Sequence, residues 1–378
     1  MIPLSIPNIS EIEQAAVARA LESGWVSTAG PDISDFERKL AAMSGVPHCV
    51  AVNSGSAALH LALLAMGVQP GDFVICPNLT FVATANAIRL AGGEPILIDS
   101  AADNLPMDLD LLEAFLRDKT ELRNGKCVVA ENGRVLRAIV IVHVLADFCD
   151  MDRLLAIAAA HGVPVLEDAA AALGAQYKER PAGSMGLMGT LSFNGNKILT
   201  TGGGGAILTH DRRLADHVRH LAAQAKSFPV EYIHDAVGYN YGLPNLSAAL
   251  GLGQLLRFEE FWNRKQAIRW AYEEAFEEVE GLRLVPRSSD ENAVGYWLNC
   301  VFTEQARPLE SYLEMHDIQT RKLWVPMKRL PMYGNCFYVS DHDHSHRWYE
   351  ESLCLPSSTG LTDEDLHRVI AAVRQFFS

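Results

Sequence analysis

Lys197 has the surroundings most suggestive of chemistry in this sequence. It lies in the stretch Leu-Ser-Phe-Asn-Gly-Asn-Lys-Ile-Leu-Thr-Thr-Gly-Gly-Gly-Gly, residues 191–205, and no Asp, Glu, Arg or second Lys occurs between Arg180 and Asp211. A lysine that is withdrawn from water without a counter-charge has a lowered pKa, because desolvation disfavours the ammonium form. Such an amine can form a Schiff base with a carbonyl group, and the glycines would let the backbone approach a bulky ligand. A buried lysine at a tight turn is the alternative that this stretch alone leaves open.

Three further stretches place polar or aromatic residues where predicted strands end. Asn53-Ser54-Gly55-Ser56-Ala57 lies between a strand and a helix, so its N–H groups and hydroxyls are suited to a phosphate. Asp168 ends an apolar strand, where a carboxylate is costly unless a cation meets it; a helix cap is the alternative. The ring of Phe81 could stack on a planar ligand, or it could be an ordinary core aromatic.

These four features fit one ligand. Pyridoxal phosphate needs a phosphate site, a stacking ring, a carboxylate for its pyridinium nitrogen and a nearby lysine. We therefore expect this cofactor where the four stretches meet.

The motifs also support a resemblance to a known family. Over most of its length the sequence resembles the DegT/DnrJ/EryC1/StrS sugar aminotransferases, which are fold type I enzymes that load amino groups onto nucleotide-linked keto-sugars. The motifs that carry the resemblance are Asn53–His60, Thr80–Asn86, Glu167–Ala170, Ser192–Lys197 and Gly238–Tyr241. The stretches most similar to the branch that makes 4-amino-4,6-dideoxy derivatives of UDP-N-acetylhexosamine are Ile2–Pro7, Gly24–Ser27, Thr320–Trp324 and Leu330–Tyr333.

The resemblance implies roles for individual residues. Lys197 would carry pyridoxal phosphate as a Schiff base and then move protons, and Asp168 would pair with the pyridine nitrogen. The implied cofactor-binding residues are Lys197, Asp168, Phe81, Gly55, Ser56, Ser192 and Asn240. Asn240 would reach the phosphate from the neighbouring subunit, which implies a homodimer with shared active sites.

The resemblance also implies substrates. Glutamate would donate the amino group, and a 4-keto-6-deoxy nucleotide sugar, expected to be a UDP-linked N-acetylhexosamine, would accept it. The residues expected to contact the substrate are Thr28, Arg321, Lys328 and Tyr333.

The sequence departs from the family at four positions. Ala171 stands where Gln, Glu or His is usual near the cofactor's phenolic oxygen, and Gly242 stands where Arg normally follows Gly-Tyr-Asn-Tyr. Ser247 replaces Gln or Asn, and Lys328 replaces the His of the branch. These departures keep two alternatives open: a sugar dehydratase that uses the same cofactor, and a cofactor-binding regulatory protein with little turnover. The dehydratases that resemble this family carry His in place of the lysine, so Lys197 argues against the first.

The elements that must position these residues alternate along the first two thirds of the chain, which indicates an α/β fold with a mainly parallel sheet. The predicted strands are His48–Asn53, Phe73–Cys76, Pro95–Asp99, Ala138–His143, Val163–Glu167 and Gly205–Thr209. The predicted helices are 10–24, Ile33–Ser44, Ser56–Met66, Val82–Leu90 and Met151–His161. In such sheets ligands bind beyond the carboxyl ends of the strands.

The pattern changes after residue 245, where Ser247–Gly281 is strongly helical. We therefore predict a large cofactor-binding domain over residues 1–248 and a smaller α+β domain over residues 249–378. The smaller domain should contain strands at Leu282–Val285 and Tyr296–Phe302, and helices at Leu309–His316 and Thr362–Phe377.

Composition limits the function classes. The chain has 378 residues and a formal net charge of -14, which argues against nucleic-acid or membrane-surface binding. The 7 cysteines lack Cys-x-x-Cys spacing, and with no visible signal peptide they indicate reduced thiols and a cytoplasmic protein. The His-rich tract at 341–346 is interpreted as polar surface rather than a metal site, and His143 as a satisfied histidine at a strand end.

Overall fold

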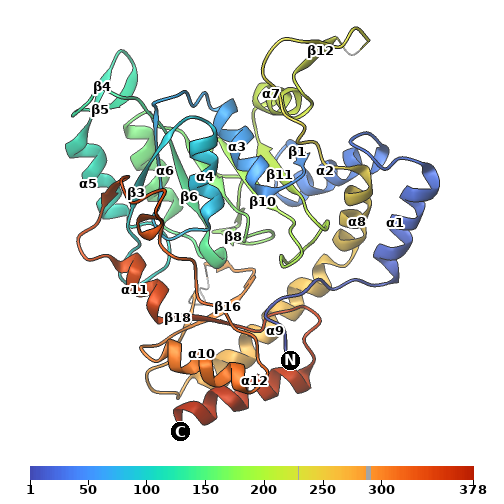
Figure 1. The fold of residues 1–378 in the computed structure, drawn as a ribbon, viewed down its shortest axis with the longest axis vertical. Coiled ribbons are helices and arrows are strands. Elements are labelled where there is room, and N and C mark those ends of the chain that lie inside the picture. The colour runs from blue at the N-terminus through green and yellow to red at the C-terminus, as the bar shows by residue number, and fades with distance from the viewer. Residues whose placement is uncertain (229, 287–290) are drawn as a thin grey trace.

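A mixed sheet forms the centre of the larger part of the molecule (Figure 1). The computed structural model describes residues 1–228, 230–286 and 291–378. Within them the sheet has 8 strands in the order β1-β11-β10-β7-β6-β2-β3-β17. Their bounds are β1 His48–Val52, β2 Phe73–Pro77, β3 Glu94–Ile98, β6 Leu136–Val142, β7 Val165–Asp168, β10 Met188–Ser192, β11 Gly205–Thr209 and β17 Phe337–Val339.

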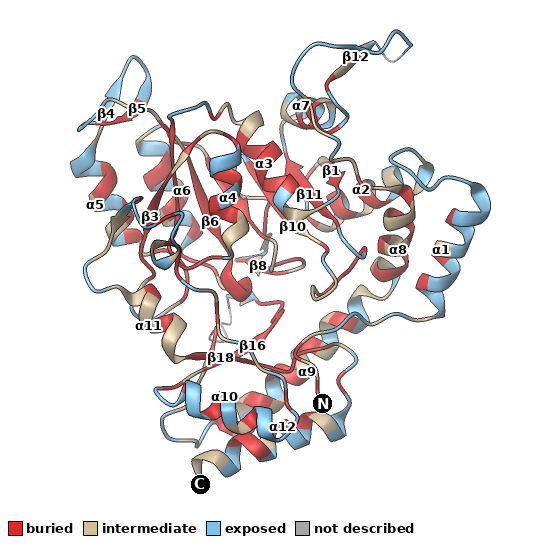
Figure 2. Ribbon diagram, viewed as in Figure 1, coloured by how far each residue is buried: buried red, intermediate tan, exposed pale blue. Residues whose placement is uncertain are grey.

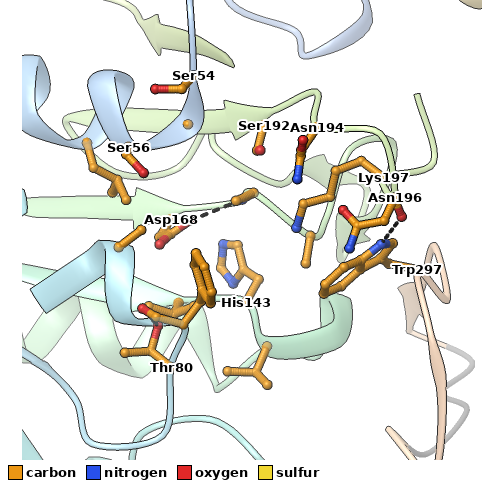
Figure 3. A pocket seen from close by; sticks show the side chains of 18 of the residues that line it. Ser54, Ser56, Thr80, His143, Asp168, Ser192, Asn194, Asn196, Lys197 and Trp297 are labelled. Atoms are coloured by element: carbon orange, nitrogen blue, oxygen red, sulfur yellow. Dashed lines mark hydrogen bonds between the residues drawn. The ribbon is translucent and has the colours of Figure 1, made fainter. Parts of the chain in front are cut away.

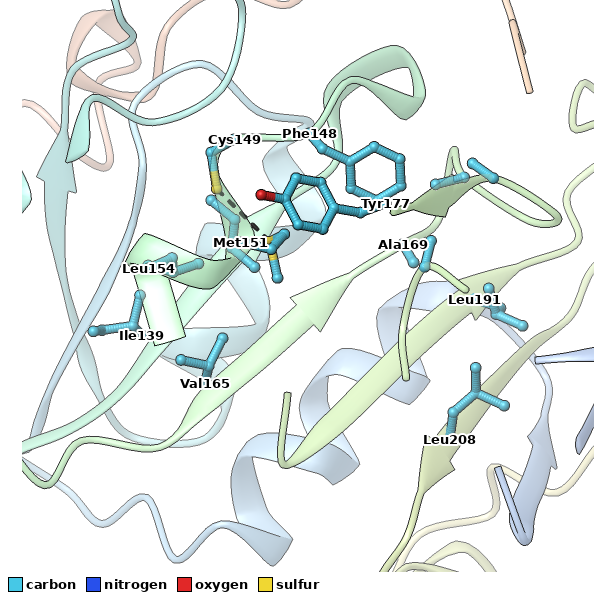
Figure 4. Packing of buried hydrophobic residues seen from close by; sticks show 14 of the residues in the cluster. Ile139, Phe148, Cys149, Met151, Leu154, Val165, Ala169, Tyr177, Leu191 and Leu208 are labelled. Carbon is cyan, nitrogen blue, oxygen red and sulfur yellow. Dashed lines mark hydrogen bonds between the residues drawn. The ribbon is translucent and has the colours of Figure 1, made fainter. Parts of the chain in front are cut away.

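Helices cover both faces of this sheet. Those against one face are α2 Pro31–Met43, α5 Leu109–Lys119, α6 Met151–Ala160 and α8 Asn245–Leu256. Those against the other are α3 Gly55–Ala65, α4 Val82–Leu90 and α7 Arg212–Ala222. Apart from the edge strand β17, the strands are almost entirely buried (Figure 2), and Figure 4 shows Ile139, Val165 and Leu208 of three strands facing the first layer. Burial on both faces explains why the strands read as continuous apolar runs.

The α/β fold is confirmed, with two differences in the sheet. β11 runs antiparallel to both of its neighbours, β1 and β10, although the other strands are mutually parallel. β17 comes from the C-terminal part of the chain and pairs with β3 as the edge strand. An apolar run has no direction of its own, so its pattern does not distinguish these arrangements.

Several helix ends follow the capping chemistry that the sequence indicates. Ser10 forms a capping box with Glu13 at the start of α1, Glu11–Ser23, and Gly24 ends this helix with a φ of 77°. Asp150 caps α6, and Thr362 caps α12, Asp363–Phe377. Side-chain caps act on local N–H groups, so sequence alone can indicate them.

The remaining elements form a smaller layer near the two chain ends (Figure 1). Its antiparallel sheet contains β14 Arg283–Val285, β16 Asn299–Phe302 and β18 Ser352–Leu355, and the helices near it are α9 Phe258–Phe276, α10 Ala306–Met315 and α12. The predicted domain boundary at 248/249 falls inside α8, and the N-terminal Ile2 bridges to Ile318 of this layer.

Short elements complete the described chain. The helical ones are η1 Val144–Ala146, η2 Met327–Arg329 and α11 His344–Glu351; the hairpin strands are β4 Thr120–Arg123, β5 Lys126–Val129, β8 Gln176–Tyr177, β9 Arg180–Pro181, β12 Lys226–Phe228, β13 Ile233–His234 and β15 Asn292–Ala293. α11 begins inside the His-rich tract 341–346, where the buried Asp99 accepts the N–H groups of His344 and Ser345. In the described ranges no helix is long and apolar enough to cross a membrane.

Candidate active site

A cavity of ≈ 360 Å³ opens beyond the carboxyl ends of the parallel strands. Figure 3 shows residues of the four predicted stretches converging on it. The cavity-lining residues that the sequence singled out are Gly55, Ser56, Phe81, Asp168, Ser192, Lys197 and Arg321. They come from segments that are far apart in the chain, and the sheet brings them together because parallel strands end at one edge.

Lys197 has the environment expected of a nucleophilic amine. Withdrawal from water lowers its pKa to about 7; the charge of Asp168 opposes this shift and that of Arg321 adds to it. Its Nζ lies 3.6 Å from the centre of the Trp297 ring, a cation–π contact. The Trp297 indole in turn donates from Nε1 to the carbonyl oxygen of Asn196, 2.6 Å away. At neutral pH the amine is therefore poised between its charged and neutral forms.

Asp168 is a buried carboxylate without a salt bridge in the described part of the chain. Burial raises its pKa, and a hydrogen bond from the Thr84 hydroxyl opposes that shift. Thr84 Oγ1 lies 2.8 Å from Oδ2, and the N–H of Ala170 lies 3.2 Å from Oδ1. Thr80 extends this chain with a hydroxyl 2.9 Å from that of Thr84. The carboxylate is therefore held in one orientation but lacks a cationic partner, as a site for a pyridinium nitrogen requires.

The N-terminus of α3 forms the opposite wall. Ser54 caps the helix through the N–H of Ala57, and Ser54, Gly55 and Ser56 line the cavity at the positive end of the helix. A Cβ on Gly55 would lie 2.8 Å from Cβ of Ser192, so only glycine allows this close approach. The first turn of α3 and two serine hydroxyls thus form a cradle for an anion.

Aromatic residues line the outer side of the cavity. The Phe81 ring is 54% exposed and lies 6.1 Å from that of Trp324. Trp324 stacks with Trp297 at a centroid distance of 6.3 Å and an interplanar angle of 18°. Phe81 is therefore a cavity residue rather than a core aromatic, and the tryptophans extend its surface toward Lys197.

His143 lies at the floor of the cavity, and only one of its nitrogens has a partner. Nε2 lies 2.9 Å from Oε2 of Glu167, and both side chains are fully buried. Nδ1 is buried without a hydrogen-bond partner among the described residues. The interpretation as a satisfied histidine therefore holds for one ring nitrogen and not for the other.

Four other residues expected in the site lie outside this cavity. Asn240 and Thr28 line a second, smaller cavity. The Lys328 ammonium donates to the carbonyl oxygens of Gly334 and Cys336, at 2.8 and 2.9 Å. Tyr333 is buried, and its hydroxyl donates to the Asn86 side chain. Within one chain the side chains of Asn240, Lys328 and Tyr333 make hydrogen bonds to neighbouring segments, and the roles of all four residues toward substrate or a second subunit stay predictions.

The departures from the family lie in different places. Ala171 lines the main cavity, where it offers only a methyl group. Gly242 lines the second cavity, and a Cβ there would lie 3.4 Å from Thr28. Ser247 is in the first turn of α8. Only Ala171 can act on a ligand in the main cavity directly.

Comparisons with known proteins agree with this arrangement. The model of the DegT/DnrJ/EryC1/StrS aminotransferase family matches residues 7–374. The chain belongs to this family. It is 33% identical to the GDP-perosamine synthase of Escherichia coli O157:H7 over 100% of this chain and 99% of that protein. It is 35% identical to the spore coat polysaccharide biosynthesis protein SpsC of Bacillus subtilis (strain 168), over 99% and 96%. Among solved structures, DesV of S. venezuelae superposes with a TM-score of 0.88 at 30% identity, over 100% and 99%.

The enzyme is therefore a pyridoxal phosphate-dependent sugar aminotransferase. The residues present fit the cofactor: Lys197 can bind its aldehyde, Asp168 can pair with its ring nitrogen, and the cradle at Gly55 can hold its phosphate. In the described ranges no group of three or more His, Cys, Asp or Glu side chains is arranged to hold a metal ion.

Sequence reasoning missed some cavity residues. Trp297 follows a glycine and a tyrosine in a strand-like segment, and nothing in that pattern indicates that its ring reaches Lys197. Thr84 lies in a motif that the resemblance identified, but its hydrogen bond to Asp168 depends on how α4 packs beside β7. Asn194 and Asn196 precede the lysine by three residues and one residue, and could have been included.

Proposed function

We propose that the enzyme transfers the amino group of glutamate to the 4-keto carbon of a nucleotide-linked 4-keto-6-deoxy sugar, with a UDP-linked N-acetylhexosamine as its substrate. The observation that carries the transfer is the meeting of Lys197, Asp168 and the α3 cradle in one cavity. The choice of sugar rests on the sequence similarity to the branch that makes 4-amino-4,6-dideoxy sugars.

Lys197 acts twice in this reaction. When bound, pyridoxal phosphate supplies an aldehyde for amino-group exchange and a ring that accepts electrons. Lys197 would hold the cofactor through its amine, and once the donor has taken its place the free amine would move a proton between the donor's Cα and the cofactor's aldehyde carbon. A pKa of about 7 suits this task, since the amine can take up and release a proton near neutral pH.

Asp168 would keep the cofactor ring able to accept electrons. Its buried carboxylate stabilises a protonated ring nitrogen, and Thr84 holds it in place at 2.8 Å. Because the site is buried, the attraction between the carboxylate and the protonated nitrogen would be stronger than in water.

The outer part of the cavity offers contacts for the nucleotide sugar. Arg321 lines the cavity and makes no salt bridge within the described ranges, so its guanidinium can meet a diphosphate or a substrate carboxylate. The faces of Trp324 and Phe81 lie beside it and offer apolar contact to a sugar ring or base. A similar enzyme is named GDP-perosamine synthase, so UDP-linked and GDP-linked acceptors are compared directly.

The test uses the purified, cofactor-loaded enzyme with glutamate and a matched pair of acceptors. We expect the UDP-linked 4-keto-6-deoxy N-acetylhexosamine to gain an amino group, measured by mass spectrometry together with 2-oxoglutarate release. The GDP-linked 4-keto-6-deoxy hexose should react much more slowly. Lys197→Ala is the inactive control, and borohydride should attach the cofactor only to the peptide that contains Lys197.

The possible failures have separate meanings. A preference for the GDP sugar would contradict the proposed nucleotide but not aminotransfer. Loss of a sugar hydroxyl without gain of nitrogen would indicate the dehydratase alternative. A cofactor that binds but never reacts with glutamate would support the regulatory alternative.

A further inference from the structure

His143 combines full burial with an unused hydrogen-bonding atom. It follows β6, its backbone N–H donates to the carbonyl oxygen of Asp168, and its ring lines the cavity. Nε2 is engaged by Glu167, whereas Nδ1 has no partner among the described residues. A buried polar atom that faces a ligand cavity and has no protein partner is expected to be satisfied by the ligand.

Glu167 fixes the orientation of the histidine. Besides the His143 ring, its oxygens accept the N–H groups of Gly183, Met185 and Gly186 at 2.9, 2.6 and 2.6 Å. Four donors to one carboxyl group require the ionised form. The ring of His143 must therefore present a proton at Nε2 to Glu167, which leaves Nδ1 directed away from Glu167.

The constitution of the cofactor shows which of its atoms could use Nδ1. In the pyridine ring the carbon that bears the phenolic oxygen lies on the path from the nitrogen to the aldehyde-bearing carbon. The carbon that bears the phosphate arm lies on the opposite side of the aldehyde-bearing carbon. Asp168 and Lys197 are the partners of the nitrogen and the aldehyde, and α3 holds the phosphate. In Figure 3 the His143 ring lies between Asp168 and Lys197, on the side away from Ser54 and Ser56. Ala171, the position at which the family usually carries a side chain for this oxygen, lines the cavity and has no hydrogen-bonding side chain.

We propose that His143 Nδ1 forms the hydrogen bond to the cofactor's phenolic oxygen, with Glu167 as the group that fixes its ring. The inference rests on the cofactor rather than on the identity of the sugar. In this contact Nδ1–H of His143 donates and the phenolic oxygen accepts. The oxygen is then held as a phenolate that accepts a hydrogen bond. His143 would thereby supply the hydrogen bond that the methyl group of Ala171 cannot make.

This arrangement predicts the titration of the lysine-bound cofactor. A donor to the phenolate stabilises the form in which the lysine nitrogen has lost its proton. Removal of the donor should therefore raise the midpoint, which is the pH at which the absorbance of the lysine-bound cofactor is half changed. A hydrogen bond to a charged group corresponds to a rise of about one to two pH units. The charged groups that face this site among the described residues are Glu167, Asp168, Lys197 and Arg321, and all are retained in the variants below.

The experiment compares two amide substitutions of His143 in the cofactor-loaded protein. His143→Gln places an amide near Nε2 and loses the donor at Nδ1, so the absorbance midpoint should rise by about one to two pH units. His143→Asn places an amide near Nδ1 and loses the contact with Glu167, so its midpoint should stay closer to that of the wild type although its melting temperature falls. A purely structural histidine would give the reverse order or no spectral shift.

A second substitution provides a matched control. Ala171→Gln adds an amide at the neighbouring position, and it should lower the midpoint in the His143→Gln background more than in the wild type, because only the former lacks a donor. An unchanged midpoint in His143→Gln, or equal effects of Ala171→Gln in both backgrounds, would overturn the proposal. These readouts need no sugar substrate, so they remain valid if the proposed acceptor is wrong.

Discussion

At the scale of single residues, the site works through contrasts in burial and charge. Lys197 and Asp168 occupy one cavity, yet their pKa values are shifted in opposite directions, because burial lowers that of the amine and raises that of the acid. Both shifts reduce the charge that must be buried in the protein without its cofactor. A cofactor with a cationic ring nitrogen would favour the ionised form of Asp168, because it supplies a counter-charge for the carboxylate.

Asp168→Asn should leave folding largely intact and lower turnover by several orders of magnitude, because a neutral ring nitrogen is a poor electron sink. Steady-state kinetics together with a thermal melt measure both effects. Thr84→Val is the matched milder change, since it removes only the 2.8 Å hydrogen bond and should cost far less activity. Near-normal turnover of Asp168→Asn would mean that the carboxylate serves only as a local cap.

At the scale of elements, the cavity depends on close packing at the start of α3. Gly55 lets the helix approach β10, and its matched control is Gly203, whose added Cβ would have no neighbour nearer than 4.0 Å. The two glycines line the same cavity but differ in the room around them.

Gly55→Ala should weaken cofactor binding about 5- to 150-fold, if the overpacking cost of about 1–3 kcal/mol falls on the cofactor-bound form. Gly203→Ala should bind nearly as the wild type does. Fluorescence titration of the cofactor-free proteins measures both affinities. Equal affinities for the two variants would show that the close contact with Ser192 can relax without cost.

Lys265 joins the smaller layer to the site. It lies in α9, is 1% exposed, and its ammonium donates to the carbonyl oxygens of Trp297 and Ser357. Burial lowers its pKa to about 7. Its hydrogen bonds therefore hold the segment that places Trp297 over Lys197.

A depressed lysine pKa makes stability depend on pH. Between about pH 7 and the ordinary lysine value of 10.5 the unfolded chain binds the proton and the folded chain does not, so stability rises with pH across this window. For one proton the slope is at most about 1.4 kcal/mol per pH unit. Lys265→Met should reduce this slope in chemical denaturation of the cofactor-free protein. Parallel profiles for the two proteins would mean that Lys265 stays charged when buried.

At the scale of the whole molecule, residues implied in cofactor binding lie in two places. Asn240 hydrogen-bonds Gln224 beside the second cavity and does not line the main one. Trp25 and Val26, just before Thr28 in the chain, and Tyr232, between Gln224 and Asn240, are exposed apolar side chains. We predict that a second copy of the chain binds here and covers these side chains. Asn240 of each chain would then reach the phosphate cradle of the other.

Mixing two defective variants tests this shared site. If Asn240 acts across a dimer, Lys197→Ala and Asn240→Ala chains that exchange subunits should recover about a quarter of wild-type turnover, since half the dimers then contain one intact site. Each variant alone, carried through the same exchange, is the control. No recovery in verified mixed dimers would place Asn240 in its own chain's site or in none.

The sequence by itself determined what depends on neighbours along the chain. The caps at Ser10, Asp150 and Thr362 satisfy N–H groups within a few residues, so α1, α6 and α12 could be predicted. The isolation of Lys197 from other charges is likewise visible in the sequence, and so are the apolar strands that end at Asp168 and His143.

Tertiary structure decided what depends on partners distant in the chain. β11 runs antiparallel and β17 joins the large sheet because of pairing between remote strands, which an apolar pattern does not specify. Trp297 reaches Lys197, and Glu167 takes only one nitrogen of His143, because packing brings these side chains together. Lys328 donates to two carbonyl groups of its own loop for the same reason. Hydrogen bonds and ring contacts act over a few ångströms, so residue types indicate which groups the site can use, and only the fold determines which of them meet.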